Sequence, residues 1–120
     1  MRWLIDASNV IGSRPDGWWR DRAGAARRLI AALEGFGEDV TVVLDAGPPE
    51  LAGRTGCVEV VIAPRRGRDA ADDEIVRLVE HATDPSDLRV VTSDSELADR
   101  VRALGAEVEG AGSFRSRLEG

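Results

Sequence analysis

The sequence lacks several residues on which common chemistries depend. All sixteen basic residues are arginine, so any mechanism that requires a lysine is excluded. The single cysteine, Cys57, cannot form a disulfide within the chain, and its apolar run CVEVVIA favours a buried, unreactive thiol. The only histidine, His81, lies late in an expected helix, where a surface position suits it better than a catalytic one.

Long hydrophobic runs and positive net charge are also missing. No apolar stretch reaches the roughly 18 residues that a membrane span requires, and no signal-peptide pattern opens the chain, so we expect a cytoplasmic protein. The formal net charge of −6 argues against broad electrostatic attraction to nucleic acid. The arginines nevertheless gather in two segments, one at 14–22 and one at 65–68.

What the 120 residues do contain fits one globular domain. The chain is 42% hydrophobic and 32% charged, and its aliphatic residues come in groups of strand and helix length. A domain of this size buries about two thirds of the surface that its unfolded chain exposes. No glycine-rich turn follows the first expected strand, so neither dinucleotide binding nor a P-loop is indicated.

Apolar runs of strand length alternate with helical patterns along the chain. The expected strands cover residues 3–5, 40–44, 57–63, 88–92 and 106–108. Three helices are expected between them. The first follows a lead-in at 18–21 and ends at 35–37, the second covers 70–82, and the third begins near 94. This alternation predicts an α/β domain with a parallel sheet and right-handed crossovers. The strand at 57–63 is interrupted by Glu59, which favours a position at or near the sheet edge.

Helical spacing predicts which side of each helix faces the sheet. The inward residues are expected to be Ala26, Leu29, Ile30 and Leu33, then Ile75, Leu78, Val79 and Ala82, then Leu97, Val101 and Leu104.

Three of the apolar runs end in aspartate. Asp6 follows the first strand, Asp45 the second and Asp94 the fourth. In an open α/β sheet, ligands bind at the carboxyl ends of the strands, so the pattern predicts three carboxylates along one functional edge. Asn9 lies close behind Asp6, and a purely structural alternative is that Asp6 and Asn9 only shape the turn after the strand.

The helix expected at 70–82 carries two adjacent aspartates with different helical phase. Asp72 precedes Ile75 and Val79 by three and seven residues, so it is expected to point towards the sheet edge. Asp73 precedes Arg77 by four residues, a spacing that favours a surface ion pair.

Two acidic positions have a structural alternative at helix N-termini. Asp69 could be only the N-cap of the helix that follows it. Residues Ser93 to Glu96 match the Ser-x-x-Glu capping box, with Ser93 as the cap. Asp94 could still lean towards the sheet edge beside such a cap.

Carboxylates that are held close together repel one another unless a cation lies between them. Oxygen ligands without a histidine cluster suit Mg²⁺ or Mn²⁺, which activate water and neutralise charge in phosphate chemistry. The acidic residues therefore indicate a divalent metal site.

Taken together, these motifs resemble a known family over nearly the whole chain. Asp6 and Asn9 in LIDASN, Asp72 and Asp73 in ADDEIVRLV, and Asp94 in VVTSD are similar to the NYN-type branch of the PIN-like nucleases. The resemblance implies a three-layer, doubly wound parallel sheet of strand order 3-2-1-4-5 with helices on both faces. It also implies a Mg²⁺- or Mn²⁺-dependent endoribonuclease.

The same resemblance implies roles for individual residues. The catalytic residues would be Asp6, Asn9, Asp72 and Asp94, with Asn9 as the amide that organises the site. The metal ligands would be Asp6, Asp72, Asp73, Asp94 and Glu96. Many relatives carry a further acid shortly after the equivalent of Asp94, and here Glu96 either fills that role or belongs to the capping box.

Aromatic and basic residues give RNA a binding surface. Single-stranded RNA stacks its bases on aromatic rings and offers phosphates to arginines. The expected substrate-binding residues are Trp18, Trp19, Arg20, Arg22, Arg65, Arg66 and Arg68. The two tryptophans could instead pack the first helix onto the sheet.

Other functions remain open at this point. The chain could be a non-catalytic RNA-binding module with a weakened acidic site, acting alone, as a homodimer or within a larger RNA-processing assembly. A receiver-like phosphotransfer domain also places aspartates at strand ends, but that class generally relies on a lysine, which this chain lacks.

Overall fold

The structure is a computed structural model that describes residues 1–64, 67 and 69–120. Within these ranges the strands are β1 (Arg2–Asp6), β2 (Val40–Leu44), β3 (Gly53–Thr55), β4 (Val58–Ile62), β5 (Leu88–Val91) and β6 (Glu107–Glu109). They form one sheet of order β3-β4-β2-β1-β5-β6, parallel except where β3 pairs antiparallel with β4. The expected order is therefore correct for its five strands, and β3 is added at one edge.

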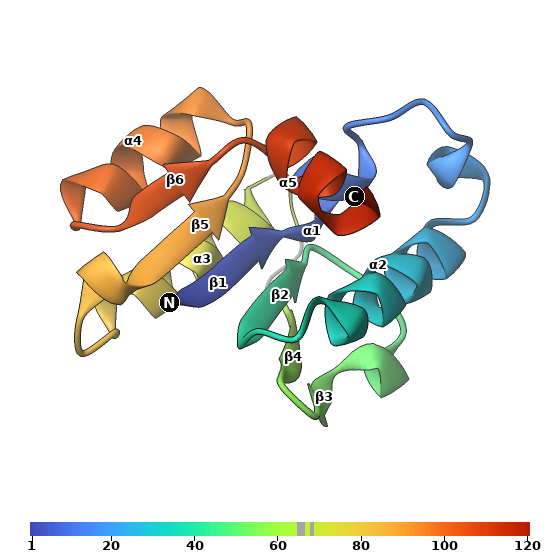
Figure 1. The fold of residues 1–120 in the computed structure, drawn as a ribbon, viewed down its shortest axis with the longest axis horizontal. Helices are drawn as coiled ribbons and strands as arrows, with labels where there is room; N and C mark the ends of the chain where they lie inside the picture. Colours follow the sequence, from blue (N-terminus) through green and yellow to red (C-terminus); the bar gives the residue numbers. More distant parts are fainter. Residues whose placement is uncertain (65–66, 68) are drawn as a thin grey trace.

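Helices cover both faces of the sheet. They are α1 (Ala7–Ile11), α2 (Arg22–Phe36), α3 (Ala70–Glu80), α4 (Ser95–Ala103) and α5 (Ala111–Glu119), with 3₁₀ turns at Trp18–Arg20, Pro49–Leu51 and Pro85–Asp87. In Figure 1, α2 and α5 lie in front of the sheet and α3 lies behind it. The predicted three-layer, doubly wound architecture is thus confirmed. No helix in the described ranges is long and apolar enough to cross a membrane.

Successive side chains of β1 point to opposite faces of the sheet. Ile5 of β1 packs with Leu33 of α2 on one face, while Leu4 packs with Ile75 of α3 on the other. Successive side chains of a strand point to opposite faces, so Asp6 follows Leu4 towards the side of α3 and α4. The chain direction of β1 therefore delivers a carboxylate to the α3 side of the sheet edge.

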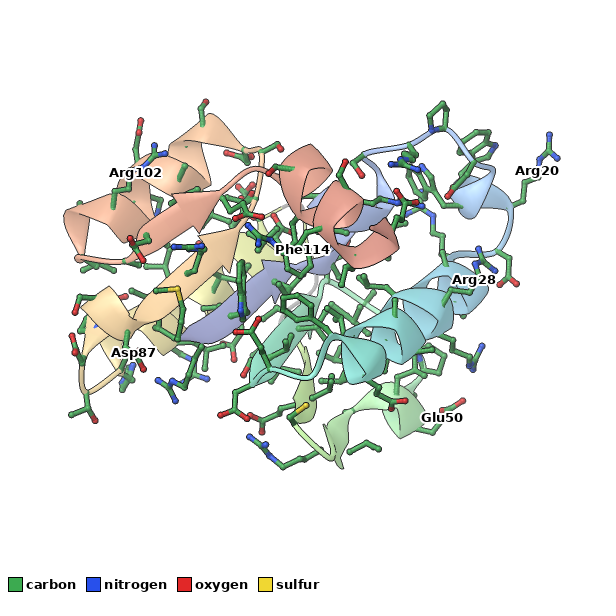
Figure 2. The ribbon with its side chains drawn as sticks, viewed as in Figure 1. Arg20, Arg28, Glu50, Asp87, Arg102 and Phe114 are labelled. Atoms are coloured by element: carbon green, nitrogen blue, oxygen red, sulfur yellow. The ribbon has the colours of Figure 1, made fainter. Side chains whose placement is uncertain are left out.

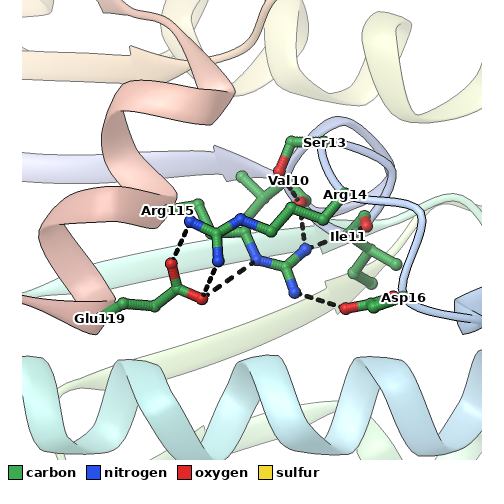
Figure 3. Close-up of polar contacts among 7 residues, drawn as sticks. All are labelled: Val10, Ile11, Ser13, Arg14, Asp16, Arg115 and Glu119. Atoms are coloured by element: carbon green, nitrogen blue, oxygen red, sulfur yellow. Dashed lines mark hydrogen bonds and ion pairs between the residues drawn. The ribbon is translucent and has the colours of Figure 1, made fainter.

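Helix α5, which the sequence analysis did not predict, fastens α1 to the rest of the domain. Phe114 of α5 is fully buried in the core on the α2 side (Figure 2). Arg115 donates from Nη1 to the backbone carbonyls of Val10 and Ile11, both at 3.1 Å, and from Nη2 to Asp16 at 2.6 Å (Figure 3). Arg115 thereby satisfies carbonyls at the C-terminal end of α1 that the short helix cannot pair internally.

The inward faces of the helices differ in part from the expected ones. Leu104 is 37% exposed, because α4 ends at Ala103 and the chain turns away at Gly105 with φ of 101°. In α3, Val76 is buried, whereas the expected inward residue Leu78 is only partly buried.

The positions of Cys57 and His81 can be compared with the expectation that neither residue is catalytic. Cys57 precedes β4 rather than lying in it, and it is partly buried against the core on the α2 side. His81 lies exposed at the C-terminal end of α3, as expected, with Nδ1 2.8 Å from the carbonyl of Arg77.

Candidate functional site

A buried carboxylate stands at the end of β1. Asp6 is 1% exposed, and its Oδ2 accepts hydrogen bonds from Asn9 Nδ2 at 2.7 Å and Thr92 Oγ1 at 3.1 Å. Burial raises the pKa of Asp6 and the charge of Asp94 adds to this, while the two hydrogen bonds lower it. Asp6 occupies the N-cap position of α1. Because its side chain also accepts a hydrogen bond from Thr92 at the end of a neighbouring strand, it does more than shape the turn after β1.

An amide and a hydroxyl tie β1 to the loop that precedes α4. Asn9 Oδ1 accepts a hydrogen bond from the backbone N–H of Ser93 at 3.0 Å. Thr92 Oγ1 accepts one from the N–H of Asp94 at 3.1 Å. Since Asn9 and Thr92 both donate to Asp6, this network fixes the position of Asp94 relative to Asp6.

Asp72 faces these carboxylates from the first turn of α3, as its helical phase predicts. Burial, followed by the charges of Asp6, Asp94 and Asp69, raises the pKa of Asp72 to about 6. Asp69 holds the N-cap position of α3, but its side chain makes no capping hydrogen bond. The charges of Asp6, Asp94 and Asp69 therefore all act on Asp72.

Asp73 points elsewhere, and its predicted ion pair with Arg77 is wrong. The Asp73 side chain is 56% exposed and lies 3.3 Å from Arg100 Nη1 of α4. Arg77 instead donates two hydrogen bonds of 2.7 Å to Glu74. Glu74 is only 6% exposed, and a buried carboxylate needs a partner more than an exposed one does.

The predicted capping box of α4 is also wrong by one residue. Asp94, not Ser93, is the N-cap, and its Oδ1 accepts from the N–H of Leu97 at 3.0 Å. Ser93 Oγ accepts from the N–H of Ala111 at the start of α5 at 2.9 Å. Glu96 lies exposed in the first turn of α4, where it is not needed for a capping box.

The side chains at this sheet edge offer oxygen atoms, the type of ligand that a hard divalent cation prefers. Asp6, Asp72 and Asp94 supply carboxylate oxygens, and the repulsion that raises the pKa of Asp72 is one that a bound cation would relieve. In residues 1–64, 67 and 69–120, however, no group of three or more His, Cys, Asp or Glu side chains is already positioned to hold a metal ion.

Asp45 lies at the same sheet edge but does not join the carboxylates. It is exposed and lines a pocket of about 400 Å³ together with Trp18, Arg22 and Ser8. Its charge is not among those that raise the pKa of Asp6 or Asp72. Asp45 therefore lies at the expected sheet edge, directly after β2, but apart from the charges that act on Asp6 and Asp72.

The two tryptophans occupy different environments. Trp18 is half-buried, and the guanidinium carbon of Arg22 lies 5.2 Å from the centroid of its ring. Trp19 is 49% exposed and meets Trp18 edge-on, with ring centroids 5.8 Å apart. Arg20 points away from the body of the molecule (Figure 2). The other predicted substrate-binding residues, Arg65, Arg66 and Arg68, lie outside the described residues.

Comparison with known families decides the classification of this α/β domain. Residues 3–120 match the family described as YacP-like NYN domain. The chain belongs to this family. It therefore has the PIN-like, nuclease-type fold of NYN domains.

Solved structures give the same assignment. The crystal structure of Rae1 (YacP) from Bacillus subtilis is 25% identical in sequence and superposes with a TM-score of 0.73, over 99% of this chain and 74% of that chain. A mutant form of the same protein matches at 23% identity with a TM-score of 0.73, over 98% and 74% of the two chains. A search of curated protein sequences gave no match.

Within this NYN domain, sequence analysis missed two residues that hold the candidate site together. Thr92 donates to Asp6, and the only signal for it was its place at the end of a strand, next to the motif aspartate. Arg115 holds the end of the helix that carries Asn9, and nothing in its surroundings in the sequence indicates this contact.

Proposed function

We propose that this YacP-like NYN domain is a divalent-metal-dependent endoribonuclease. The observation that carries the proposal is the position of Asp72, whose pKa rises to about 6 because burial and three neighbouring carboxylates act on it. Strongly perturbed carboxyl groups at the ligand-binding edge of an α/β sheet are characteristic of functional sites. The nuclease-type fold of the family supports the same chemistry.

Asp6, Asp72 and Asp94 are the proposed ligands of a Mg²⁺ or Mn²⁺ ion. When bound, such an ion activates water and neutralises the charge that develops on the phosphate. Asn9 and Thr92 orient Asp6 through their hydrogen bonds to Oδ2, as outer partners of metal ligands commonly do.

Asp73 and Glu96 are weaker candidates for the same ion. Asp73 is directed to Arg100 at the surface, and Glu96 is exposed on α4. Both remain proposed as ligands only through their place in the sequence motif.

RNA is the proposed substrate, bound on the side of the sheet edge where Trp18, Trp19, Arg20 and Arg22 lie. These side chains combine aromatic rings for base stacking with cations for phosphates. The local arginines offset the overall charge of −6, which on its own would disfavour RNA. Arg65, Arg66 and Arg68 are proposed as further phosphate contacts from their sequence alone.

A second function is favoured by one specific observation. The described part of the chain holds no ready group of three metal-ligating side chains, and Oδ1 of Asp94 is already engaged as a helix cap. An RNA-binding module with a weakened acidic site would have these properties. The two functions differ in whether RNA is cleaved when Mn²⁺ is added.

The test is single-turnover cleavage of a labelled RNA at fixed Mn²⁺ by matched variants. Asp72→Asn keeps the shape of the side chain and removes its charge, so we expect the rate to fall by at least roughly a hundredfold. Asp73→Asn makes the same change one residue away at an exposed position and should cost far less. If the unmodified protein binds RNA but does not cleave it with Mn²⁺ or Mg²⁺, the binding module is the correct function.

A further inference from the structure

A pocket lies beside the carboxylate site at the same sheet edge. This pocket, of about 400 Å³, is lined by α1, the 3₁₀ turn at Trp18–Arg20, α2 and the loop after β2. Ala7 and Ser8, which line it, directly follow Asp6 in the chain, but Asp6, Asp72 and Asp94 do not line it. The pocket is therefore a separate site that adjoins the carboxylates along the same sheet edge.

The size and walls of the pocket suit a flat heterocycle. Its volume lies at the small end of the range of about 300–1,000 Å³ that small-molecule sites occupy. Trp18 contributes an aromatic ring and Arg22 a guanidinium group that lies over that ring. Unstacked nucleobases bind to such surfaces, by stacking on aromatic rings and on arginine planes.

Asp45 provides the pocket with a hydrogen-bonding group of defined polarity. An ionised carboxylate only accepts hydrogen bonds, and it can accept two in parallel. Guanine presents two adjacent N–H donors on its Watson–Crick edge, at N1 and N2. Adenine and cytosine place a ring acceptor next to their amino group, and uracil places carbonyl oxygens on both sides of its single N–H. A carboxylate therefore selects guanine among the four bases.

We propose that this pocket binds a guanine base of the RNA, next to the phosphodiester bond held at the carboxylate site. The base stacks against the Trp18–Arg22 pair, and Asp45 accepts hydrogen bonds from its N1–H and N2–H. This inference rests on the proposed function, because it takes RNA as the substrate, and it adds a base preference and Asp45 as the residue that determines it.

Binding of short single-stranded RNAs to the full chain in EDTA tests the pocket without the metal site. Four fluorescein-labelled RNAs differ only in one central base, and a fifth carries inosine, which lacks the N2 amino group. A bidentate contact to a base discriminates by roughly five- to a hundredfold, so the guanine RNA should bind that much more tightly than the other three standard RNAs. The inosine RNA should have an intermediate affinity, since it keeps the N1–H donor.

Asp45→Asn is the decisive variant, because Asp45 is exposed and its replacement leaves the core untouched. We expect this variant to lose the preference for guanine. Asp99→Asn changes another exposed aspartate, on α4, and should keep the preference for guanine. A guanine preference that persists in Asp45→Asn, or its absence from the unmodified protein, would overturn the inference. So would binding of free GMP without any preference among the RNAs.

The outcome is separable from that of the proposed function. A guanine preference without cleavage in Mn²⁺ would leave the pocket standing and refute the nuclease. Cleavage at all four central bases alike, with no preference in binding, would support the nuclease and refute the guanine pocket.

Discussion

The carboxyl end of β1 separates two regions of different chemistry. On the α3 side, burial raises the pKa values of Asp6 and Asp72, and the charge of Asp94 adds to both shifts. On the α2 side, Trp18 and Arg22 line an open pocket. The alternation of a single strand makes this division, since Leu4 and Asp6 point to one side and Ile5 to the other. We therefore expect variants on the α3 side to change RNA cleavage and variants on the α2 side to change RNA binding.

Apart from the loss of a proposed metal ligand such as Asp72, the largest expected effect is on the α3 side alone. Asn9→Ala removes the hydrogen bond to Asp6 and the partner of the Ser93 N–H. Losing an outer partner of a metal ligand typically costs about 10- to 100-fold, so single-turnover cleavage in Mn²⁺ should slow by that factor. RNA binding in EDTA should not change. Urea unfolding of the Asn9→Ala variant is the control for damage to the helix, and a loss of cleavage no larger than the loss of folded protein would contradict the role of Asn9.

The next effect is on the α2 side alone. Trp18→Ala should weaken the binding of single-stranded RNA by roughly five- to a hundredfold, because base stacking on an aromatic ring contributes about 1–3 kcal/mol. Stabilisation by Mn²⁺ should be the same as in the unmodified protein. Trp19→Ala is measured beside it, with folding checked by circular dichroism. If both variants bind RNA normally, the tryptophans only pack the 3₁₀ turn and α2.

A smaller effect concerns stability and its pH dependence without metal. The raised pKa of Asp72 means that the folded chain binds this proton more tightly than the unfolded chain does. The proton on Asp72 therefore stabilises the folded chain. Its contribution is complete below the ordinary pKa of 3.8 and is lost as the pH rises through about 6. At pH 7.5 in EDTA, Asp72→Asn should therefore raise the free energy of unfolding by roughly 1–2 kcal/mol, after allowance for partial exposure. This gain should vanish near pH 4.

Asp73→Asn is the matched control for that measurement. It removes only an exposed ion pair with Arg100, so unfolding by urea should change by no more than about 0.5 kcal/mol. A gain of equal size at both pH values in Asp72→Asn would show that its charge is not the cause.

The sequence predicted the sheet well because strand signals are local. Buried apolar runs identified β1, β2, β4 and β5, and the family resemblance supplied their order. The three residues of β3 carry too little signal, and they pair only because β4 offers a free edge. Helices α1 and α5 were missed for related reasons: α1 is a five-residue helix without periodicity, and α5 contains Gly112, which disfavours helix.

For the candidate site, the sequence offered two usable signals: the residue at which each strand ends and the helical phase of each acidic residue. They predicted that Asp72, rather than Asp73, faces the sheet edge, where the charges of Asp6 and Asp94 act on it. They failed where a tertiary contact competes with a local one, as when Glu74 takes the arginine expected for Asp73. They also gave no sign that Asp45 lines the pocket.

Thermal unfolding with and without Mn²⁺ tests the central claim, a metal site on the α3 side, most directly. At ten times its Kd, an ion that binds only the folded chain adds roughly 1.4 kcal/mol, which raises the Tm of a domain of this size by about 5 °C. We expect this rise in the unmodified protein, in Asp73→Asn and in Trp18→Ala, and its loss in Asp72→Asn. No rise in the unmodified protein, or an equal rise in Asp72→Asn, would contradict it.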